Sequence, residues 1–383
     1  MRRLAWASGL LTLTLVATGC TDSNSGTDGE IAIGVSLDRT GASAALGAGE
    51  GNALTLVADE LNKQGVLGKK IKLIIKDNKS DGKESARVVK ELVEKDKVAA
   101  IIGGSSTTTT LSYLDYVTEK KIPAISMGAS DTIVNPVAKR QYIFKTPANG
   151  PAVVGAMVQE FTARGITKVG LLAPTSAYGD FGVNALTVAT QQAGIELVRV
   201  ERFEESAKDY KPEIGRLIDA EPQSIVIAAI MPGAGIAAKN IKELGFDGRV
   251  YNDGGAGAEL FVAGAGDASE GMSMIHPSIL AANQLTATTP SALAQKEFFT
   301  KYTQRYGTYS GYASYGADAL NLLVAAIRKA DSTDGKKIRD ALEGISYDGL
   351  GGSYQFGTGN HGGASGDGLT VLTVRKGAWV LAQ

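Results

Sequence analysis

Short apolar runs alternate with longer stretches of helical pattern along most of this chain, and this alternation restricts the folds open to it. In the first part of the chain, the apolar runs that predict strands are residues 31–37, 71–75, 98–102 and 123–126. Apolar residues at helical spacing follow the first three of these runs, at residues 53–61, 86–93 and 111–117. Strands that are apolar over their whole length are typical of a parallel sheet covered by helices on both faces. The pattern therefore predicts a doubly wound α/β layout.

A second series of the same kind follows further along the chain. Its predicted strands are residues 169–172, 196–200, 225–229 and 250–252, and its predicted helices are residues 151–164, 183–193, 210–218 and 234–244. A chain of 383 residues exceeds what one hydrophobic core usually accommodates. No polar, low-complexity linker separates the two series. We therefore expect two Rossmann-like lobes tied by several crossings of the chain.

The last part of the chain changes character twice. It first becomes mostly helical, with predicted helices at residues 296–306, 313–329 and 336–342. Two short apolar runs, residues 369–374 and 378–381, then flank Lys376 and Gly377, which is typical of a β-hairpin.

The N-terminus has the pattern of a secretory signal peptide. Arg2 and Arg3 precede an apolar run at residues 4–17, which is too short to span a bilayer comfortably. The run ends in Val-Ala-Thr-Gly-Cys, which resembles the lipobox of bacterial lipoproteins, where Cys20 would be acylated and become the first mature residue. The alternative is an ordinary cleaved signal that ends near a stray cysteine. We expect a signal peptide over residues 1–19 and a lipidated, flexible tether over residues 20–29, which are small or polar.

Composition argues against several classes of function. The 39 basic and 40 acidic residues give a net charge of -1, so the chain has no electrostatic footprint for nucleic acid or for an anionic lipid surface. Cys20 is the only cysteine and there are two histidines, which leaves too few ligands for a His/Cys metal site. His361 lies among turn-forming residues and is expected to be an exposed loop histidine rather than a catalytic base. We expect no metal, no cofactor and no enzymatic activity.

A glycine cluster at Gly47, Gly49 and Gly51 is the one feature that could suggest a nucleotide. Dinucleotide-binding chains place Gly-x-Gly-x-x-Gly directly after the first strand, because the backbone there must approach the pyrophosphate closely. Here nine residues separate Leu37 from Gly47. A nucleotide-dependent enzyme is therefore a remote alternative, and we interpret the cluster as the glycine-rich start of the first helix.

The most polar end of a predicted strand is the run of hydroxyl residues at 105–110. Ligands of open α/β sheets bind at the carboxyl ends of the strands, and hydroxyls beside free backbone amides suit a carboxylate. One of the hydroxyls could instead cap the following helix, a role worth about 1 kcal/mol. A run of six hydroxyls leaves several free after capping, so both roles can hold together.

Several short segments, each common on its own, also recur in the order and spacing of one known family. They are residues 40–41 with 46–47, 77–81, 122–126, 178–179, 266–271 and 312–319. Through these segments the mature chain resembles the type I periplasmic binding proteins of the leucine/isoleucine/valine family over nearly its whole length. The resemblance implies two lobes joined by three crossings, residues 30–147 with 276–355 in lobe 1 and residues 148–275 with 356–383 in lobe 2.

The family also implies how such a protein works. Its ligand lies in the cleft between the lobes, and closure of the lobes is what an ABC-type permease recognises. The expected protein is a monomer that faces the periplasm or the cell surface, binds a small molecule and touches the membrane only through lipidated Cys20. A sensor that docks to a membrane receptor is an alternative use of the same fold.

The resemblance assigns several ligand-binding positions. The ligand carboxylate would be held at Thr107, with Ser105 and Ser106 just before it. A second contact segment comprises Gly128, Ala129 and Ser130, where a backbone carbonyl faces the ligand ammonium and the Ser130 hydroxyl reaches either ligand charge. Further positions that match the family are Tyr178, which closes over the ligand from lobe 2, Tyr312 in lobe 1, and Leu46 with Ile230 and Met231 around the ligand side chain.

The expected ammonium partner departs from the family pattern. Amino-acid binders of the family place a carboxylate after the strand that here covers residues 250–252, and an ungapped match sets it at Gly254. Asp253, one residue earlier, is the only acid available there. The residues favour a branched-chain or related amino acid as ligand, and an aromatic or other organic acid is the alternative, because residues 142–147 and 231–240 resemble a subgroup in which some members bind such acids.

Overall fold

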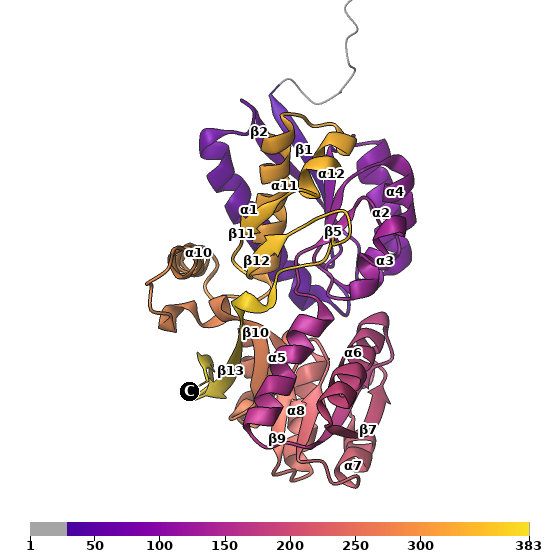
Figure 1. Ribbon diagram of the computed structural model, residues 1–383, viewed down its shortest axis with the longest axis vertical. Helices are drawn as coiled ribbons and strands as arrows, with labels where there is room; N and C mark the ends of the chain where they lie inside the picture. Colours follow the sequence, from indigo (N-terminus) through magenta and orange to yellow (C-terminus); the bar gives the residue numbers. More distant parts are fainter. Residues whose placement is uncertain (1–28, 383) are drawn as a thin grey trace, which may run out of the picture.

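The computed structural model describes residues 29–382, which form two α/β lobes placed end to end along the long axis of the molecule (Figure 1). The predicted signal peptide, Cys20 and all of the predicted tether except Gly29 lie outside the described residues. The two lobes and their sheets confirm the predicted fold class. Within residues 29–382, no helix combines the length and the apolar character that crossing a bilayer requires.

Lobe 1 is built on a parallel five-stranded sheet with the order β2-β1-β3-β4-β5. Its strands are β1 (Glu30–Leu37), β2 (Lys70–Asp77), β3 (Ala100–Gly103), β4 (Ala124–Ser126) and β5 (Ile143–Lys145). One side of the sheet is covered by α1 (Ala44–Gln64), α11 (Ala313–Ala330) and α12 (Gly335–Leu342), and the other by α2 (Gly82–Glu94), α3 (Thr107–Leu111) and α4 (Leu114–Lys120) (Figure 1). The carboxyl ends of β1 and β3 point toward lobe 2, so the loops that follow them lie at the junction of the lobes.

Lobe 2 contains a seven-stranded sheet with the order β14-β13-β10-β9-β8-β6-β7. Its strands are β6 (Lys168–Pro174), β7 (Glu196–Phe203), β8 (Ser224–Ile227), β9 (Arg249–Asn252), β10 (Ser273–Pro277), β13 (Leu369–Arg375) and β14 (Ala378–Leu381). One face carries α5 (Gly150–Ala163) and α6 (Ala177–Ala193), and the other carries α7 (Lys211–Ile218), α8 (Gly233–Glu243) and α9 (Glu259–Ala265). The predicted C-terminal hairpin is present as β13 and β14, which pair antiparallel. Strand β13 also pairs antiparallel with β10 and so joins the hairpin to the sheet.

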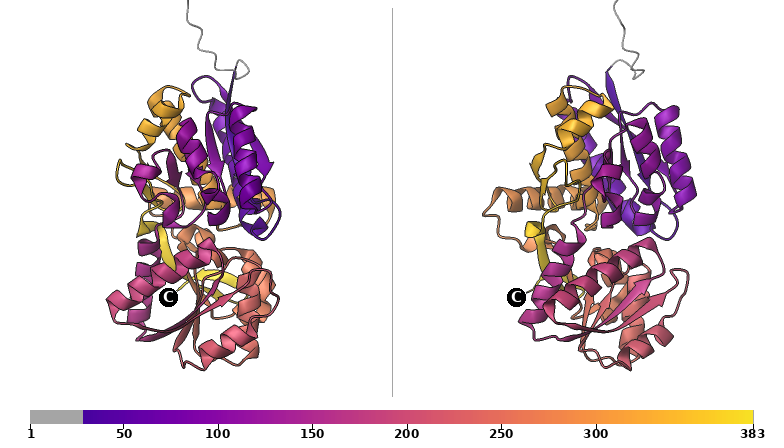
Figure 2. Two further views of the ribbon diagram at one scale, coloured as in Figure 1. Left: turned by 90° about the vertical axis from the view of Figure 1, so that its right-hand side faces the viewer. Right: turned by 45° about the vertical axis from the view of Figure 1, so that its right-hand side comes forward.

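The chain passes between the two sheets three times within residues 29–382. It leaves lobe 1 after β5, returns after β10 through α10 (Pro290–Tyr306), and leaves again after the short hairpin of β11 (Ser346–Asp348) and β12 (Ser353–Gln355). Figure 2 shows that the connecting segments gather on one side of the molecule. β10 runs through Pro277, so the sheet of lobe 2 extends two residues past the predicted boundary at residue 275.

Several elements differ from the sequence-based prediction: α9, β11 and β12 were not predicted, and two further differences have a local cause. The helix predicted over residues 111–117 is two helices, α3 and α4, separated at Ser112 and Tyr113, where the Ser112 hydroxyl donates to the Thr109 carbonyl at 2.8 Å. β10 was not predicted, because His276 and Pro277 interrupt its apolar pattern.

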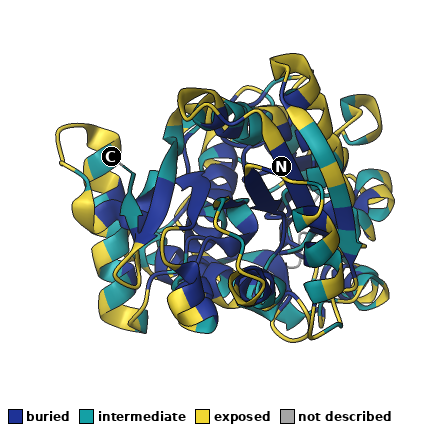
Figure 3. Cartoon of the chain, turned by 90° about the horizontal axis from the view of Figure 1, so that it is seen from below, coloured by how far each residue is buried: buried dark blue, intermediate teal, exposed yellow. Residues whose placement is uncertain are grey.

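Burial follows the layered arrangement. Seen from below, the central strands are buried while the outer faces of the helices are exposed (Figure 3), and the edge strands β2 and β7 are only partly buried. Ile33 and Val35 of β1 and Leu171 of β6 are fully buried, as expected for parallel strands covered on both faces. The sheets are therefore rigid supports for the loops at their carboxyl ends.

Candidate functional site

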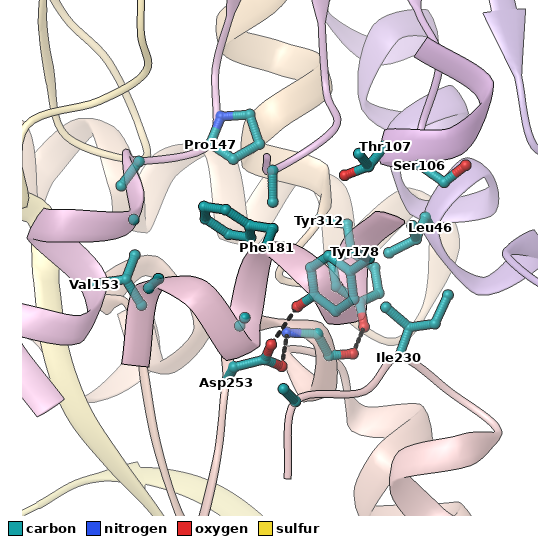
Figure 4. A pocket seen from close by; sticks show the side chains of 18 of the residues that line it. Leu46, Ser106, Thr107, Pro147, Val153, Tyr178, Phe181, Ile230, Asp253 and Tyr312 are labelled. Carbon is teal, nitrogen blue, oxygen red and sulfur yellow. Dashed lines mark hydrogen bonds between the residues drawn. The ribbon is translucent and has the colours of Figure 1, made fainter. Parts of the chain in front are cut away.

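A cavity of ≈ 190 Å³ lies between the lobes and is lined by residues of both. Lobe 1 contributes the start of α1 with Leu46 and the loop between β3 and α3 with Thr107. Lobe 2 contributes Tyr178 at the start of α6, Ile230 after β8 and Asp253 after β9 (Figure 4). The contributing loops follow the carboxyl ends of parallel strands, which is where α/β sheets bind ligands.

Asp38, which is fully buried just after β1, holds the hydroxyl-rich loop at residues 105–110 in place. Its Oδ1 accepts hydrogen bonds from the Ser105 amide at 3.2 Å and the Thr109 hydroxyl at 2.9 Å. The Ser105 hydroxyl in turn accepts a bond from the Asp38 amide at 3.2 Å. Ser105 therefore joins the loop to the sheet, and its oxygen is engaged within the protein.

The sequence analysis leaves open whether the hydroxyls cap the helix or bind a carboxylate. Ser106 caps the helix, and Thr107 is free for a carboxylate. The Ser106 hydroxyl accepts a bond from the Thr109 amide at 3.3 Å and so caps α3. The Thr107 hydroxyl only accepts a long bond, 3.4 Å, from the Ser130 amide, which leaves its proton free to donate. Among the described residues, the amides of Thr107 and Thr108 have no hydrogen-bond acceptor. Thr107 is thus the member of the loop best arranged to donate to a carboxylate.

The segment at residues 128–130 supports the site more than it lines it. Ala129 reaches the cavity, whereas Gly128 and Ser130 do not. The Ser130 hydroxyl accepts a bond from the Thr132 amide at 3.3 Å, at the start of a short 3₁₀ helix. The resemblance places a backbone carbonyl of this segment against a ligand ammonium, and the Ala129 carbonyl accepts a bond from Lys145 Nζ at 2.7 Å. That carbonyl already has a cationic partner from the protein.

Lys145 is a site-supporting residue that the sequence does not reveal. Its side chain is fully buried at the end of β5, where Nζ also donates to the Ala148 carbonyl at 3.2 Å and pairs with Asp131 at 2.9 Å. Burial lowers the pKa of Lys145, while the charge of Asp131 opposes that shift. The one sequence signal for it is a lysine that directly follows the apolar residues Ile143 and Phe144.

Asp253 lies on the lobe 2 side of the cleft, and its contacts fix the orientation of its carboxyl group. The Tyr178 hydroxyl donates to Oδ2 at 2.5 Å, and the Gly255 amide donates to Oδ1 at 2.9 Å (Figure 4). Burial away from water raises the pKa of Asp253, and the hydrogen bonds from Tyr178 and Gly255 lower it. Burial has the larger effect, so the pKa is about 7. The carboxyl therefore faces the cavity in a state that changes its charge near neutral pH.

Tyr312 joins the two lobes at the same place. It is buried, its ring lines the cavity, and its hydroxyl donates to the Gly255 carbonyl of lobe 2 at 2.6 Å. Leu46 and Ile230 line the cavity beside it, whereas Met231 packs near Gly235 and Gly264, away from the lining.

Glu50 is a second carboxyl group at the cavity that the sequence analysis does not identify. It is buried on α1 one turn after Leu46, and its Oε2 has no hydrogen-bond partner among the described residues. Burial raises the pKa of Glu50 well above its usual value, and the nearby charge of Asp38 adds to the shift. The sequence indicates the burial of Glu50 only through its position, because Glu50, Ala53 and Val57 share the buried face of α1.

Both histidines are fully buried. His361 is not an exposed loop residue: it is fully buried and stacks on Phe144 with ring centroids 4.1 Å apart. One ring nitrogen bonds the Ile143 carbonyl at 2.9 Å and the other lies 3.2 Å from Glu343, so it is a structural residue in lobe 1. His276 is also fully buried, at the end of β10. Among residues 29–382, no cluster of histidine, cysteine and acidic side chains is arranged to hold a metal ion.

Comparison with known proteins places the chain among binding proteins. A family model described as "Periplasmic binding protein" matches residues 30–378. The leucine-, isoleucine-, valine-, threonine- and alanine-binding protein of Pseudomonas aeruginosa is 24% identical over 305 residues, which is 76% of each chain. An extracellular ligand-binding receptor from Rhodopseudomonas palustris HaA2 has a similar structure, with a TM-score of 0.86, 25% identity, and coverage of 92% of this chain and 99% of the other. A solute binding protein of an ABC transporter from Rhodopseudomonas palustris BisB5, solved with 3,4-dihydroxybenzoic acid, has a TM-score of 0.79, 23% identity, and coverage of 91% and 95%.

Proposed function

Because the chain belongs to the periplasmic binding protein family, we propose that it is the extracytoplasmic solute-binding subunit of an ABC importer and that its ligand is an amino acid. The family consists of proteins that bind substrates, and a named relative binds leucine, isoleucine, valine, threonine and alanine. Transport, rather than a chemical reaction, is the function that this fold and cleft support.

The observation that carries the proposal is that Thr107 and Asp253 line one cavity from opposite lobes. Thr107 offers a free hydroxyl proton and an unpaired amide to a carboxylate. Asp253 offers a carboxyl group to an ammonium. An α-amino acid carries both charges on one carbon, so binding it draws the lobes together, and closure would be the signal for the permease.

The contacts around the cavity favour a side chain, rather than a backbone carbonyl, as the partner of the ligand ammonium. The Ala129 carbonyl already accepts a bond from the charged Lys145, which disfavours a second cation there, so Asp253 is the stronger partner for the ammonium. Leu46, Ile230 and the rings of Tyr178 and Tyr312 surround the remaining space with apolar surface. This division into two polar ends and an apolar wall is typical of small-molecule sites.

The test compares amino acids with their deaminated analogues by isothermal titration calorimetry. The wild-type protein is expected to bind leucine at least tenfold more tightly than 4-methylpentanoate, and Asp253→Asn is expected to lose most of that preference. Asp267→Asn, an acid on the outer side of lobe 2, serves as the matched control and keeps the preference. A wild-type protein that already prefers the deaminated acid would overturn the amino-acid assignment.

An organic acid is the second candidate, and one observation favours it. Asp253 already accepts two bonds from its own lobe and has a pKa of about 7, so the neutral form can face an uncharged ligand group. The similar protein solved with 3,4-dihydroxybenzoic acid shows that this fold accommodates such a ligand. Preference for the deaminated series in the same titrations would select it.

Anchoring through Cys20 belongs to the same proposal. It is supported by the sequence at residues 16–20, and Cys20 lies outside the described residues. Cys20→Ser should move the protein from the membrane fraction to the soluble extracytoplasmic fraction and abolish incorporation of labelled palmitate. Unchanged fractionation would show that another element holds the protein. Deletion of the permease would then separate uptake from sensing, because only an importer subunit needs it.

A further inference from the structure

Glu50 is a buried acid of the cavity that the proposed function does not use. Its side chain is 1% exposed and lines the cavity from lobe 1, one helical turn after Leu46. Its Oε2 has no hydrogen-bond partner among the described residues. A buried polar atom without a partner costs folding free energy, so an unpartnered carboxyl oxygen at a binding cavity points to a ligand group that pairs with it.

Glycines at the start of α1 and on α11 allow Glu50 to approach the end of β1. A Cβ on Gly47 would lie 2.4 Å from the carbonyl oxygen of Asp38, which follows β1. A Cβ on Gly316 of α11 would lie 2.7 Å from the carbonyl oxygen of Glu50. Any larger residue at these positions would push α1 away from the sheet or from α11. The glycine-rich start of α1 therefore serves close packing, and this packing places Glu50 at the cavity.

Glu50 is also joined to the loop that carries Thr107. Its side chain forms a hydrogen bond with the side chain of Ser105, which lies two residues before Thr107 in the loop after β3. The Ser105 hydroxyl accepts its other bond from the Asp38 amide, so its own proton is available to one oxygen of Glu50. The second oxygen, Oε2, is left for a ligand at the end of the cavity where Thr107 lies.

The charges around Glu50 determine which ligand group suits it. Among the described residues that line the cavity there is no lysine, arginine or histidine. The titratable groups that interact with Glu50 are Asp38 after β1 and, at the start of α11, Tyr312 and Tyr315; Asp253 faces the same cavity from lobe 2. All of these groups are acids. An ionised Glu50 would therefore have no counter-charge and would repel a ligand carboxylate.

A neutral Glu50 has the opposite effect on a carboxylate. Burial raises the pKa of Glu50 well above its usual value, and the charge of Asp38 adds to this shift, whereas the bond with Ser105 lowers the pKa. The neutral form carries a proton that it can donate to an anion. Asp38 is buried as well but does not line the cavity, so Glu50 is the member of this pair that a ligand can contact.

We infer that Glu50 is a further ligand-binding residue, whose protonated carboxyl group donates a hydrogen bond to the ligand carboxylate beside Thr107. The inference rests on the proposed function, because it takes the carboxylate to lie at Thr107. It adds that a carboxylate ligand binds together with one proton. Where Glu50 is ionised in the free protein, binding takes up that proton from the solvent, and no other bond forms or breaks.

The first test replaces Glu50 and measures the affinity for 4-methylpentanoate by isothermal titration calorimetry at about pH 6. Glu50→Gln keeps the shape of the side chain and offers an N–H donor, so its affinity should stay within about threefold of the wild type. Glu50→Leu offers no donor and should bind about tenfold more weakly or worse. Glu60→Gln, an acid of α1 that is partly exposed and pairs with Lys63, is the matched control and keeps the affinity.

The second test follows the ratio of the wild-type affinity to the Glu50→Gln affinity from about pH 6 to about pH 10. The ratio cancels the titration of Asp253, which both proteins share. Ionisation of Glu50 removes the donor and adds a repelling charge, so the ratio should fall at the alkaline end of this range, by about tenfold for each pH unit. Calorimetry in buffers of different ionisation enthalpy should show there that the wild type takes up about one proton more than Glu50→Gln.

The outcomes separate this inference from the proposed function. Unchanged affinity in Glu50→Leu would show that Glu50 does not contact the ligand. A constant ratio across the pH range would show that Glu50 supplies no proton, and a ratio that rises with pH would assign Glu50 to a ligand ammonium instead. In each of these cases the ligand still binds, so only the inference is overturned.

Two further points keep the test decisive. If neither leucine nor 4-methylpentanoate binds the wild-type protein, the proposed function fails and the role of Glu50 fails with it. Thermal unfolding without ligand checks that each variant is folded. The pH test uses only Glu50→Gln, which has the shape of the native side chain, so the inference can be overturned even if Glu50→Leu does not fold.

Discussion

The Tyr178 hydroxyl donates a hydrogen bond to Asp253 Oδ2 at 2.5 Å, from the first turn of α6 to the loop after β9. Both residues belong to lobe 2, so the bond fixes the carboxyl group before any movement of the lobes. Across the cleft, Tyr312 of lobe 1 bonds the Gly255 carbonyl two residues further on. The acid that faces the ligand is therefore oriented by its own lobe and placed directly beside a contact between lobes.

The first prediction concerns the pH dependence of ligand binding. Burial raises the pKa of Asp253 to about 7, so the carboxyl is neutral below that pH and charged above it. An ammonium prefers the charged form, and affinity for an amino acid should rise between about pH 6 and pH 8 and then level off. Isothermal titration calorimetry across this range measures the rise, and Asp253→Asn should abolish it.

Tyr178→Phe provides the control for that prediction. The Tyr178 bond lowers the pKa of Asp253, so its removal should move the midpoint of the rise to higher pH. A midpoint that stays in place would show that another group controls the pH dependence, and an affinity that falls from pH 6 to pH 8 would argue for an anionic ligand without an ammonium.

The second prediction separates Thr107 from Ser106. Thr107→Ala removes the free hydroxyl and should weaken carboxylate binding by about 1 to 3 kcal/mol, with little effect on stability. Ser106→Ala removes the cap of α3 and should cost about 1 kcal/mol of folding free energy, with a much smaller effect on affinity. Titration and chemical denaturation of both variants measure the two quantities, and Thr107→Ser should restore binding. Unchanged affinity in Thr107→Ala would remove Thr107 from the site.

The fold could be predicted from the sequence because its signals are local and repeated. Buried parallel strands such as β1 and β6 are apolar over most of their length, so each can be recognised from its own residues as a short apolar run. β10 was not predicted because His276 and Pro277 are part of this short strand and interrupt its apolar pattern. Their burial comes from packing between the lobes, which no local pattern shows.

The site could be predicted only in part. Thr107 and Asp253 follow strand ends, and that position identifies them from the sequence. Glu50 lines the cavity and Lys145 supports it, and they lie inside a helix and a strand, where a charged residue is normally interpreted as solvent-exposed. Whether such a residue is buried depends on partners far along the chain, such as Asp131 for Lys145, and no local pattern records that.

The third prediction concerns acid stability through His361. Burial lowers the pKa of His361, so the unfolded chain takes up a proton at a higher pH than the folded protein does. The contribution of the neutral ring to stability is therefore complete above about pH 6.5 and is lost as the pH falls toward the folded-state pKa. His361→Phe keeps the stack on Phe144 and removes the titration. Between pH 7 and pH 5, the free energy of unfolding should fall less in this variant than in the wild type; an equal fall would assign the acid sensitivity elsewhere.

The fourth prediction concerns the ion pair between Lys145 and Asp131. Asp131 is about a quarter exposed and Lys145 fully buried, so the lysine depends on the pair more than the aspartate does. Asp131→Asn keeps the shape of the side chain and its bond to the Gly150 amide but leaves the buried ammonium without a counter-charge. It should cost about 2 to 3 kcal/mol of folding free energy, somewhat less than the loss of a fully buried partner.

A double-mutant cycle tests whether that cost comes from the pair. In Lys145→Met the ammonium is gone, and adding Asp131→Asn should then cost less than about 0.5 kcal/mol, because no buried charge remains to be left alone. Urea denaturation of the four proteins gives the coupling energy, and Asp115→Asn, whose exposed carboxylate pairs with Arg140 at the surface, is the control expected to change stability by under about 1 kcal/mol. Additive costs in the cycle would mean that Lys145 is held by the Ala129 and Ala148 carbonyls alone, and that Asp131 acts only through the start of α5.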